Sequence, residues 1–172
     1  MIGFILKVLV IKHRLVERLI DTLHFLNIAE TNTLGECEKV GAMANILIVD
    51  DTPLTHRLLN LMLQRIDNSI NIFTAYNGRE ALAQLAENTF DLVITDINMP
   101  GMDGFALMDE MRADDKYKDL PIIVLTASGH KKVPAMAAQK GATSFLTQPI
   151  SSWELKETVT RCLQGTMLGF SG

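Results

Sequence analysis

The sequence has few cysteines, and they lack the partners that a disulfide framework or a metal site needs. Its 172 residues include two cysteines, Cys37 and Cys162, which form no CxxC pair and have no histidine at metal-ligand spacing. The sequence therefore suggests neither a disulfide framework nor a cysteine-ligated zinc site, and it favours a reducing, cytoplasmic setting.

The sequence also lacks a strong excess of positive charge and a long apolar run. Its 16 basic and 20 acidic residues give a net charge of -4, which argues against direct nucleic-acid binding. The apolar stretch from Ile2 to Ile11 contains Lys7 and ends at Lys12. It is thus shorter than the ~20 residues that a membrane span requires, so we expect no transmembrane segment, and it has no features of a secretory signal.

Residues 1–43 differ in character from the rest of the chain. They begin with an amphipathic helix pattern and end in a polar linker between Ala29 and Ala44. This N-terminal extension could dimerise, dock a partner or contact a membrane surface, or it could have no settled fold. The apolar positions of the helix pattern are Val8, Ile11, Leu15, Leu19, Leu23 and Leu26.

Residues 44–165 alternate short apolar runs with helical patterns, and residues 166–172 form a short tail. The runs Ile46–Val49 and Ile122–Leu125 are apolar at every position, as in strands that helices cover on both faces. Five strand-helix units therefore predict an α/β fold with a five-stranded parallel sheet and right-handed crossovers. The expected units are Ile46–Val49 with Leu54–Ile66, Asn71–Thr74 with Arg79–Glu87, Leu92–Thr95 with Phe105–Arg112, Ile122–Thr126 with Val133–Lys140, and Ser144–Leu146 with Trp153–Leu163.

Local signals agree with these units. Thr52 followed by Pro53 is a helix N-cap with a first-turn proline. Asn77-Gly78 precedes a helical pattern, which makes it a turn into that helix rather than a hairpin.

Polar residues follow the expected strands at their carboxyl ends. Asp50 and Asp51 follow the first strand, Asp96 follows the third, and Thr126 ends the fourth. Ligands of open parallel sheets bind at this edge. Clustered carboxylates repel one another unless a cation compensates, and an oxygen-only site suits Mg²⁺. One carboxylate could then attack phosphorus and form an acyl phosphate, with the Thr126 hydroxyl bonding a phosphoryl oxygen.

The motifs at these strand ends resemble those of the response-regulator receiver family of two-component signalling, whose members are CheY-like. The resemblance covers roughly 120 residues in the family's order. It is carried by the blocks Ile46-Leu-Ile-Val-Asp-Asp-Thr-Pro, Asp91-Leu-Val-Ile-Thr-Asp-Ile-Asn-Met-Pro-Gly-Met-Asp-Gly, Leu125-Thr-Ala and Gly141-Ala-Thr-Ser-Phe-Leu-Thr-Gln-Pro.

The resemblance implies a flavodoxin-like sheet of strand order 2-1-3-4-5 and a role for each matching residue. Asp96 would be the phosphoacceptor, Thr126 the switch hydroxyl, and Phe145 the aromatic side chain that repacks with it. Mg²⁺ would be bound by Asp50, Asp51, Asp96 and the backbone carbonyl of Asn98.

The resemblance also implies the partners. The phosphoryl donor would be a histidine kinase or phosphotransfer protein, and the output would be contact with an unidentified downstream protein. We expect a stand-alone receiver, because residues 166–172 leave no room for an output domain.

One residue departs from the family pattern. Gln148 precedes Pro149 where the family has lysine. Glutamine can donate a hydrogen bond but has no charge, and hydrogen bonds of charged groups contribute about 1.5–3 kcal/mol against about 0.5–1.5 for neutral ones. We therefore expect weaker coupling between phosphorylation and the conformational switch, with Mg²⁺ binding intact.

Two alternatives to a phosphorylated receiver follow. Because of Gln148, the chain could be a receiver-like binding module that works without phosphorylation. An enzyme acting on a separate substrate is disfavoured, since the first strand ends in neither the Asp-x-Asp of a hydrolase nor a Ser/Thr/Gly-rich flavin loop. The four histidines, which have no ligand partners at suitable spacing, are expected to be on the surface or partly packed: His13, His24, His56 and His130.

Overall fold

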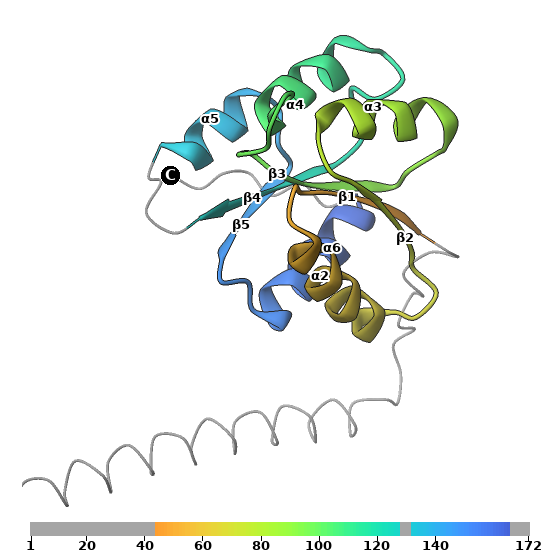
Figure 1. The fold of residues 1–172 in the computed structure, drawn as a ribbon. Helices are drawn as coiled ribbons and strands as arrows, with labels where there is room; N and C mark the ends of the chain where they lie inside the picture. The colour runs from red at the N-terminus through yellow and green to blue at the C-terminus, as the bar shows by residue number, and fades with distance from the viewer. Residues whose placement is uncertain (1–43, 128–131, 166–172) are drawn as a thin grey trace, which may run out of the picture. The chain divides into compact units, whose positions relative to one another are not determined.

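A computed structural model of the chain describes residues 44–127 and 132–165 (Figure 1). In this part, parallel strands alternate with helices in the predicted order. The sheet order is β2-β1-β3-β4-β5, which confirms the predicted topology. The expected N-terminal helix and the tail lie outside the described residues. The elements are β1 (Asn45–Val49), α2 (Pro53–Ile66), β2 (Asn71–Ala75), α3 (Gly78–Glu87), β3 (Leu92–Asp96), α4 (Gly104–Ala113), β4 (Ile122–Ala127), α5 (Val133–Gln139), β5 (Ser144–Gln148) and α6 (Ser152–Leu163).

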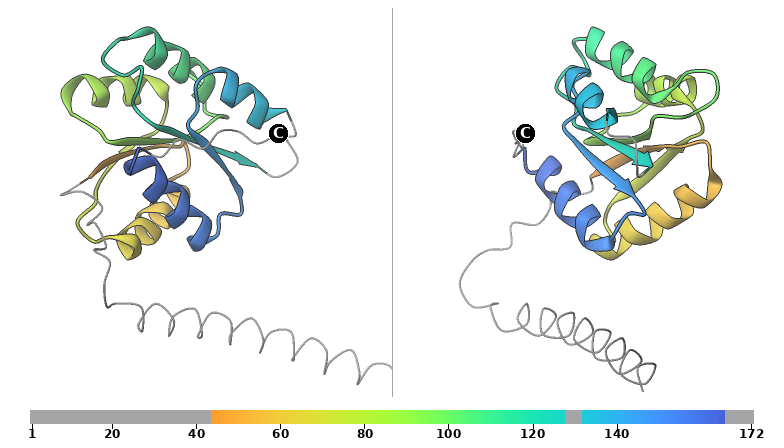
Figure 2. Two further views of the ribbon diagram at one scale, coloured as in Figure 1. Left: turned by 180° about the vertical axis from the view of Figure 1, so that it is seen from behind. Right: turned by 90° about the vertical axis from the view of Figure 1, so that its left-hand side faces the viewer.

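Helices cover both faces of the sheet. Helices α3, α4 and α5 lie on one face and α2 and α6 on the other (Figures 1 and 2). Alternate strand residues divide between the two layers: Leu47 and Val93 pack with the first set of helices, and Ile46 and Ile94 with the second. All four are fully buried. This two-sided burial explains why the strand sequences are apolar at every position.

Helix starts follow the predicted signals. Thr52 is the N-cap of α2 and Pro53 its first residue, although the Thr52 side chain makes no capping bond. The Asn77 side chain accepts a hydrogen bond from the Glu80 backbone N–H at 3.0 Å, which caps α3. The interpretation of Asn77-Gly78 as a turn into a helix is confirmed.

Strands β3 and β5 extend beyond their predicted ends into polar residues. Asp96 is the last residue of β3 and pairs with Leu125, and Gln148 is the last residue of β5 and pairs with Ala127. Backbone pairing continues past the last apolar residue because it does not depend on side-chain polarity. Both polar residues are therefore held by the sheet rather than by a loop.

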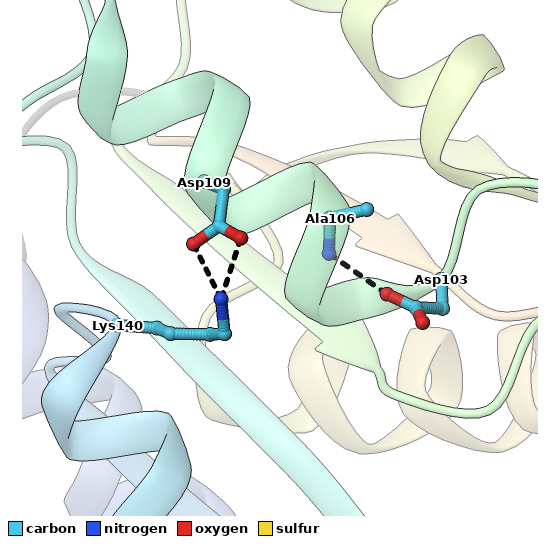
Figure 3. Close-up of polar contacts among 4 residues, drawn as sticks. All are labelled: Asp103, Ala106, Asp109 and Lys140. Carbon is cyan, nitrogen blue, oxygen red and sulfur yellow. Dashed lines mark hydrogen bonds and ion pairs between the residues drawn. The ribbon is translucent and has the colours of Figure 1, made fainter.

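Helix α4 is tied to the turn between α5 and β5. The Lys140 ammonium, at the end of α5, binds both carboxylate oxygens of Asp109, one at 2.7 Å (Figure 3). The Arg112 guanidinium donates to the carbonyls of Gly141 at 2.7 Å, Tyr117 at 2.8 Å and Leu120 at 3.0 Å. An exposed ion pair such as Asp109–Lys140 contributes about 0–1 kcal/mol, so the Arg112 bonds are the stronger connection.

Two aromatic features differ from or add to what the sequence predicted. His56, expected on the surface or partly packed, is buried at 6% exposure, and its ring lies 4.8 Å from that of Tyr76. His56 is buried because it shares the sheet-facing side of α2 with Leu59 and Leu63. Trp153, the only tryptophan in the chain, is 64% exposed near the start of α6.

In the part of the chain that the structure describes, no helix is long and apolar enough to span a membrane.

Candidate functional site

The register of the sheet brings the predicted strand-end residues to one edge. Val49 pairs with Thr95, so Asp50 and Asp96 are the next residues on neighbouring strands. Asp96 pairs with Leu125, one residue before Thr126. Asp50, Asp96 and Thr126 therefore lie at the carboxyl edge of the sheet, where parallel α/β folds bind ligands.

The two acids after β1 have different surroundings. Asp50 is 3% exposed, and its carboxylate accepts a hydrogen bond from the Thr52 N–H at 2.8 Å. Asp51 is exposed, and its carboxylate accepts from the Thr52 hydroxyl at 3.3 Å. Asp50 is thus fixed in the fold, while Asp51 faces solvent.

Asp96 is partly buried and electrostatically coupled to both of these acids. Burial raises the pKa of Asp96 above its ordinary value, and the charges of Asp50 and Asp51 raise it further. The backbone N–H groups of Ile97 and Asn98 act in the opposite direction, the latter by donating to the carboxylate at 3.1 Å. A bound cation would favour the ionised form of Asp96.

The donor set fits a hard cation that keeps part of its water shell. Within residues 44–127 and 132–165, no three or more His, Cys, Asp or Glu side chains form a preassembled metal-binding group. Mg²⁺ does not need one, because proteins commonly hold it through one or two carboxylates and several waters. Exposed Asp51 and partly buried Asp96, with the Asn98 carbonyl nearby in sequence, offer such oxygen donors. The mutual repulsion at Asp96 is the physical reason to expect a cation there.

The two predicted switch residues lie on neighbouring strands. Thr126 is 5% exposed near the end of β4. Phe145 pairs with Val124, two residues before Thr126, and packs against the core under α3, α4 and α5. Thr126 at the acidic edge and Phe145 in that layer of the core therefore lie on adjacent strands.

Gln148 ends β5 at the same edge and is partly buried. The Gln148–Pro149 peptide bond is cis. The two residues help to line a groove of about 520 Å³ against α2. Among the described residues, the charges that act on Asp96 are those of Asp50 and Asp51, and no basic side chain offsets them.

Two residues that contact the Asp96 backbone were not assigned a role from the sequence. The Thr95 hydroxyl donates to the Asp96 carbonyl oxygen at 2.8 Å. A Cβ atom added to Gly104 would lie 2.2 Å from the same oxygen, so α4 begins in direct contact with the end of β3. In the sequence, these residues are a threonine directly before Asp96 and a glycine nine residues after that threonine, and this pattern does not indicate a particular role.

Comparisons with known proteins agree with this geometry. The family model described as the response regulator receiver domain matches residues 46–160. Chemotaxis protein CheY-3 of Vibrio cholerae is 35% identical over 119 residues, which cover 69% of this chain and 91% of the relative. Chemotaxis protein CheY of Pseudomonas aeruginosa is 34% identical over 119 residues, covering 69% of this chain and 95% of the relative.

A solved structure gives the same result. The structure of the chemotaxis response regulator CheY4 of Vibrio cholerae superposes with a TM-score of 0.64 at 35% identity, covering 70% of this chain and 98% of that one. The family match, the strand order and the acidic edge lead to one conclusion. This chain belongs to the response regulator receiver domain family.

Proposed function

We propose that this receiver accepts a phosphoryl group on Asp96 from the phosphohistidine of a histidine kinase or phosphotransfer protein, and signals through a protein contact. The observation that supports this most is the convergence of Asp50, Asp51 and Asp96 in one electrostatic field at the carboxyl edge of the sheet. Asp50, Asp51, Asp96 and the Asn98 carbonyl would hold Mg²⁺. When bound, the ion would neutralise charge on the incoming phosphoryl group.

In the transfer, one carboxylate oxygen of Asp96 is the nucleophile. This oxygen attacks phosphorus while the bond between phosphorus and the donor's imidazole nitrogen breaks, and the electron pair of that bond returns to the nitrogen. The Asn98 N–H, 3.1 Å from one Asp96 oxygen, orients the carboxylate. The Thr126 hydroxyl would then bond a phosphoryl oxygen, and Phe145 would repack with it. The phosphorylated form thereby shifts the population towards an active surface.

The proposal is tested by incubating the full chain with a small phosphodonor and Mg²⁺ and measuring its intact mass. We expect a phosphoryl adduct on the wild-type protein and none on Asp96→Ala. An adduct that persists in Asp96→Ala would place the acceptor elsewhere. A wild-type chain that takes no phosphoryl group would instead support a binding module that works without phosphorylation, the alternative that Gln148 favours.

Gln148 gives a second expected result. Gln148→Lys places a positive charge at the acidic edge, so we expect acyl-phosphate formation to be about threefold to tenfold faster, since charged hydrogen bonds exceed neutral ones by about 1 kcal/mol. The rate of adduct formation by intact mass measures this. Thr147→Lys is the matched control, because it adds the same charge at an exposed neighbouring position. Equal rates in Gln148→Lys and wild type would show that Gln148 does not limit phosphoryl uptake.

A further inference from the structure

Thr95 is a polar residue at a position built for an apolar one. It is fully buried in the middle of the sheet, where it pairs with Val49 on β1 and Val124 on β4. Valine has the same branched shape and would suit this position without a polar atom. A buried hydroxyl destabilises a fold unless it is hydrogen-bonded, so the partner of this hydroxyl is informative.

That partner is the backbone of Asp96. The Thr95 hydroxyl donates to the Asp96 carbonyl oxygen at 2.8 Å. From the side of α4, Gly104 lies against the same oxygen so closely that a Cβ atom would be 2.2 Å from it, and the Gly104 N–H donates to the Ile97 carbonyl at 3.0 Å. The orientation of the Asp96 carbonyl is therefore fixed by a hydroxyl and by a close backbone contact.

Fixing this carbonyl also fixes a donor to the Asp96 carboxylate. The Asp96 carbonyl and the Ile97 N–H belong to one planar trans peptide unit and point in opposite directions. The Ile97 N–H lowers the pKa of the Asp96 carboxylate, and the next N–H along the backbone, that of Asn98, donates to this carboxylate at 3.1 Å. A rotation of this peptide plane would misalign the Ile97 N–H and allow the carboxylate to turn.

We infer that Thr95 is a positioning residue for phosphoryl acceptance: through its hydrogen bond to the Asp96 carbonyl it holds the Asp96–Ile97 peptide plane, and thereby the carboxylate, in the orientation for attack. The inference rests on the proposed function. Thr95 contacts neither the phosphoryl donor nor the reacting oxygen. Its effect therefore falls on the rate of transfer and not on the binding of the phosphodonor.

The test compares Thr95→Val, which removes only the hydroxyl, with Thr95→Ser, which keeps it. With a small phosphodonor and Mg²⁺, we expect Thr95→Val to lower the maximal rate of adduct formation about threefold to tenfold, the effect of one lost hydrogen bond. The half-saturating phosphodonor concentration should not change. Thr95→Ser should return to within about twofold of the wild-type rate. In NMR spectra without phosphodonor, the Ile97 amide proton should move upfield in Thr95→Val alone.

Thr74→Val is the matched control, since Thr74 is an exposed strand residue on β2. Should Thr95→Val not fold, Thr95→Ala and Thr95→Ser, which differ only in the hydroxyl, give the same comparison. The role of Thr95 is overturned if Thr95→Val changes neither the rate of adduct formation nor the chemical shift of the Ile97 amide proton. It is also overturned if Thr95→Ser is as slow as Thr95→Val. If the wild-type chain takes no phosphoryl group, the proposed function itself is wrong. This outcome is distinct from one in which the wild-type chain is phosphorylated and the Thr95 variants show no effect.

Discussion

Asp50→Asn combined with Asp51→Asn is expected to slow Mg²⁺-dependent phosphorylation of Asp96 by at least about a hundredfold, because two charged ligand contacts of about 1.5–3 kcal/mol each are lost. The amides have nearly the shape of the carboxylates but no charge with which to attract a cation. Removing the two charges also lowers the pKa of Asp96 towards its ordinary value, since both now raise it. The loss therefore cannot result from protonation of Asp96. The measurement is the rate of adduct formation as a function of Mg²⁺ concentration.

The chain offers a matched control for this charge change. Asp114 and Asp115 form another adjacent acidic pair, exposed after α4. Asp114→Asn with Asp115→Asn changes the net charge equally and should leave the Mg²⁺ dependence as in the wild type. The hypothesis of a metal site at the strand edge is wrong if the Asp50/Asp51 variant keeps a Mg²⁺-dependent rate within about twofold of the wild type.

Gly104→Ala is expected to destabilise the fold by about 1–3 kcal/mol, the usual effect of overpacking, and to slow phosphorylation of Asp96 in the protein that remains folded. The added Cβ would lie 2.2 Å from the Asp96 carbonyl oxygen and 2.9 Å from the Ile97 Cα. Both are backbone atoms, so they cannot rotate away as a side chain would. The end of β3 and the start of α4 must separate, which moves Asp96, the proposed phosphoacceptor. Urea unfolding and the rate of adduct formation measure the two effects.

Gly101→Ala in the same loop distinguishes the effect of a positive φ angle from the steric conflict that Gly104→Ala introduces. Gly101 has a φ of +79°, but nothing lies within 4 Å of a Cβ added there. Its replacement should cost about 1–2 kcal/mol for the left-handed conformation without displacing Asp96. A phosphorylation rate that falls equally in both variants would contradict the proposed effect of the contact between Gly104 and Asp96.

The sequence predicted most of the sheet because both of its faces are buried. Apolar runs such as Ile46–Val49 and Ile122–Leu125 can be recognised locally, and the order of elements then limits the topology. Strand ends were less accurate, since pairing continues through polar Asp96 and Gln148. The acidic edge could be predicted because in parallel sheets all the carboxyl ends lie at the same side.

The supporting contacts could not be predicted from the sequence. The Arg112 guanidinium reaches Gly141, a glycine 29 residues away, and the His56 ring contacts that of Tyr76, the residue after β2. Such contacts depend on distances between elements, which periodicity does not give. The Thr95 hydroxyl bond is local, but a lone threonine in an apolar strand does not indicate which carbonyl it meets.

Trp153 has a consequence for how this molecule can be observed. Because it is the only indole and is 64% exposed beside the connection from β5 to α6, the intrinsic fluorescence of the chain reports on one small area of surface. A protein that binds over this end of α6 would exclude water from the indole and shift its emission to shorter wavelength. Binding elsewhere would leave the emission unchanged, so the intrinsic fluorescence of the chain indicates whether a partner binds at this end of α6.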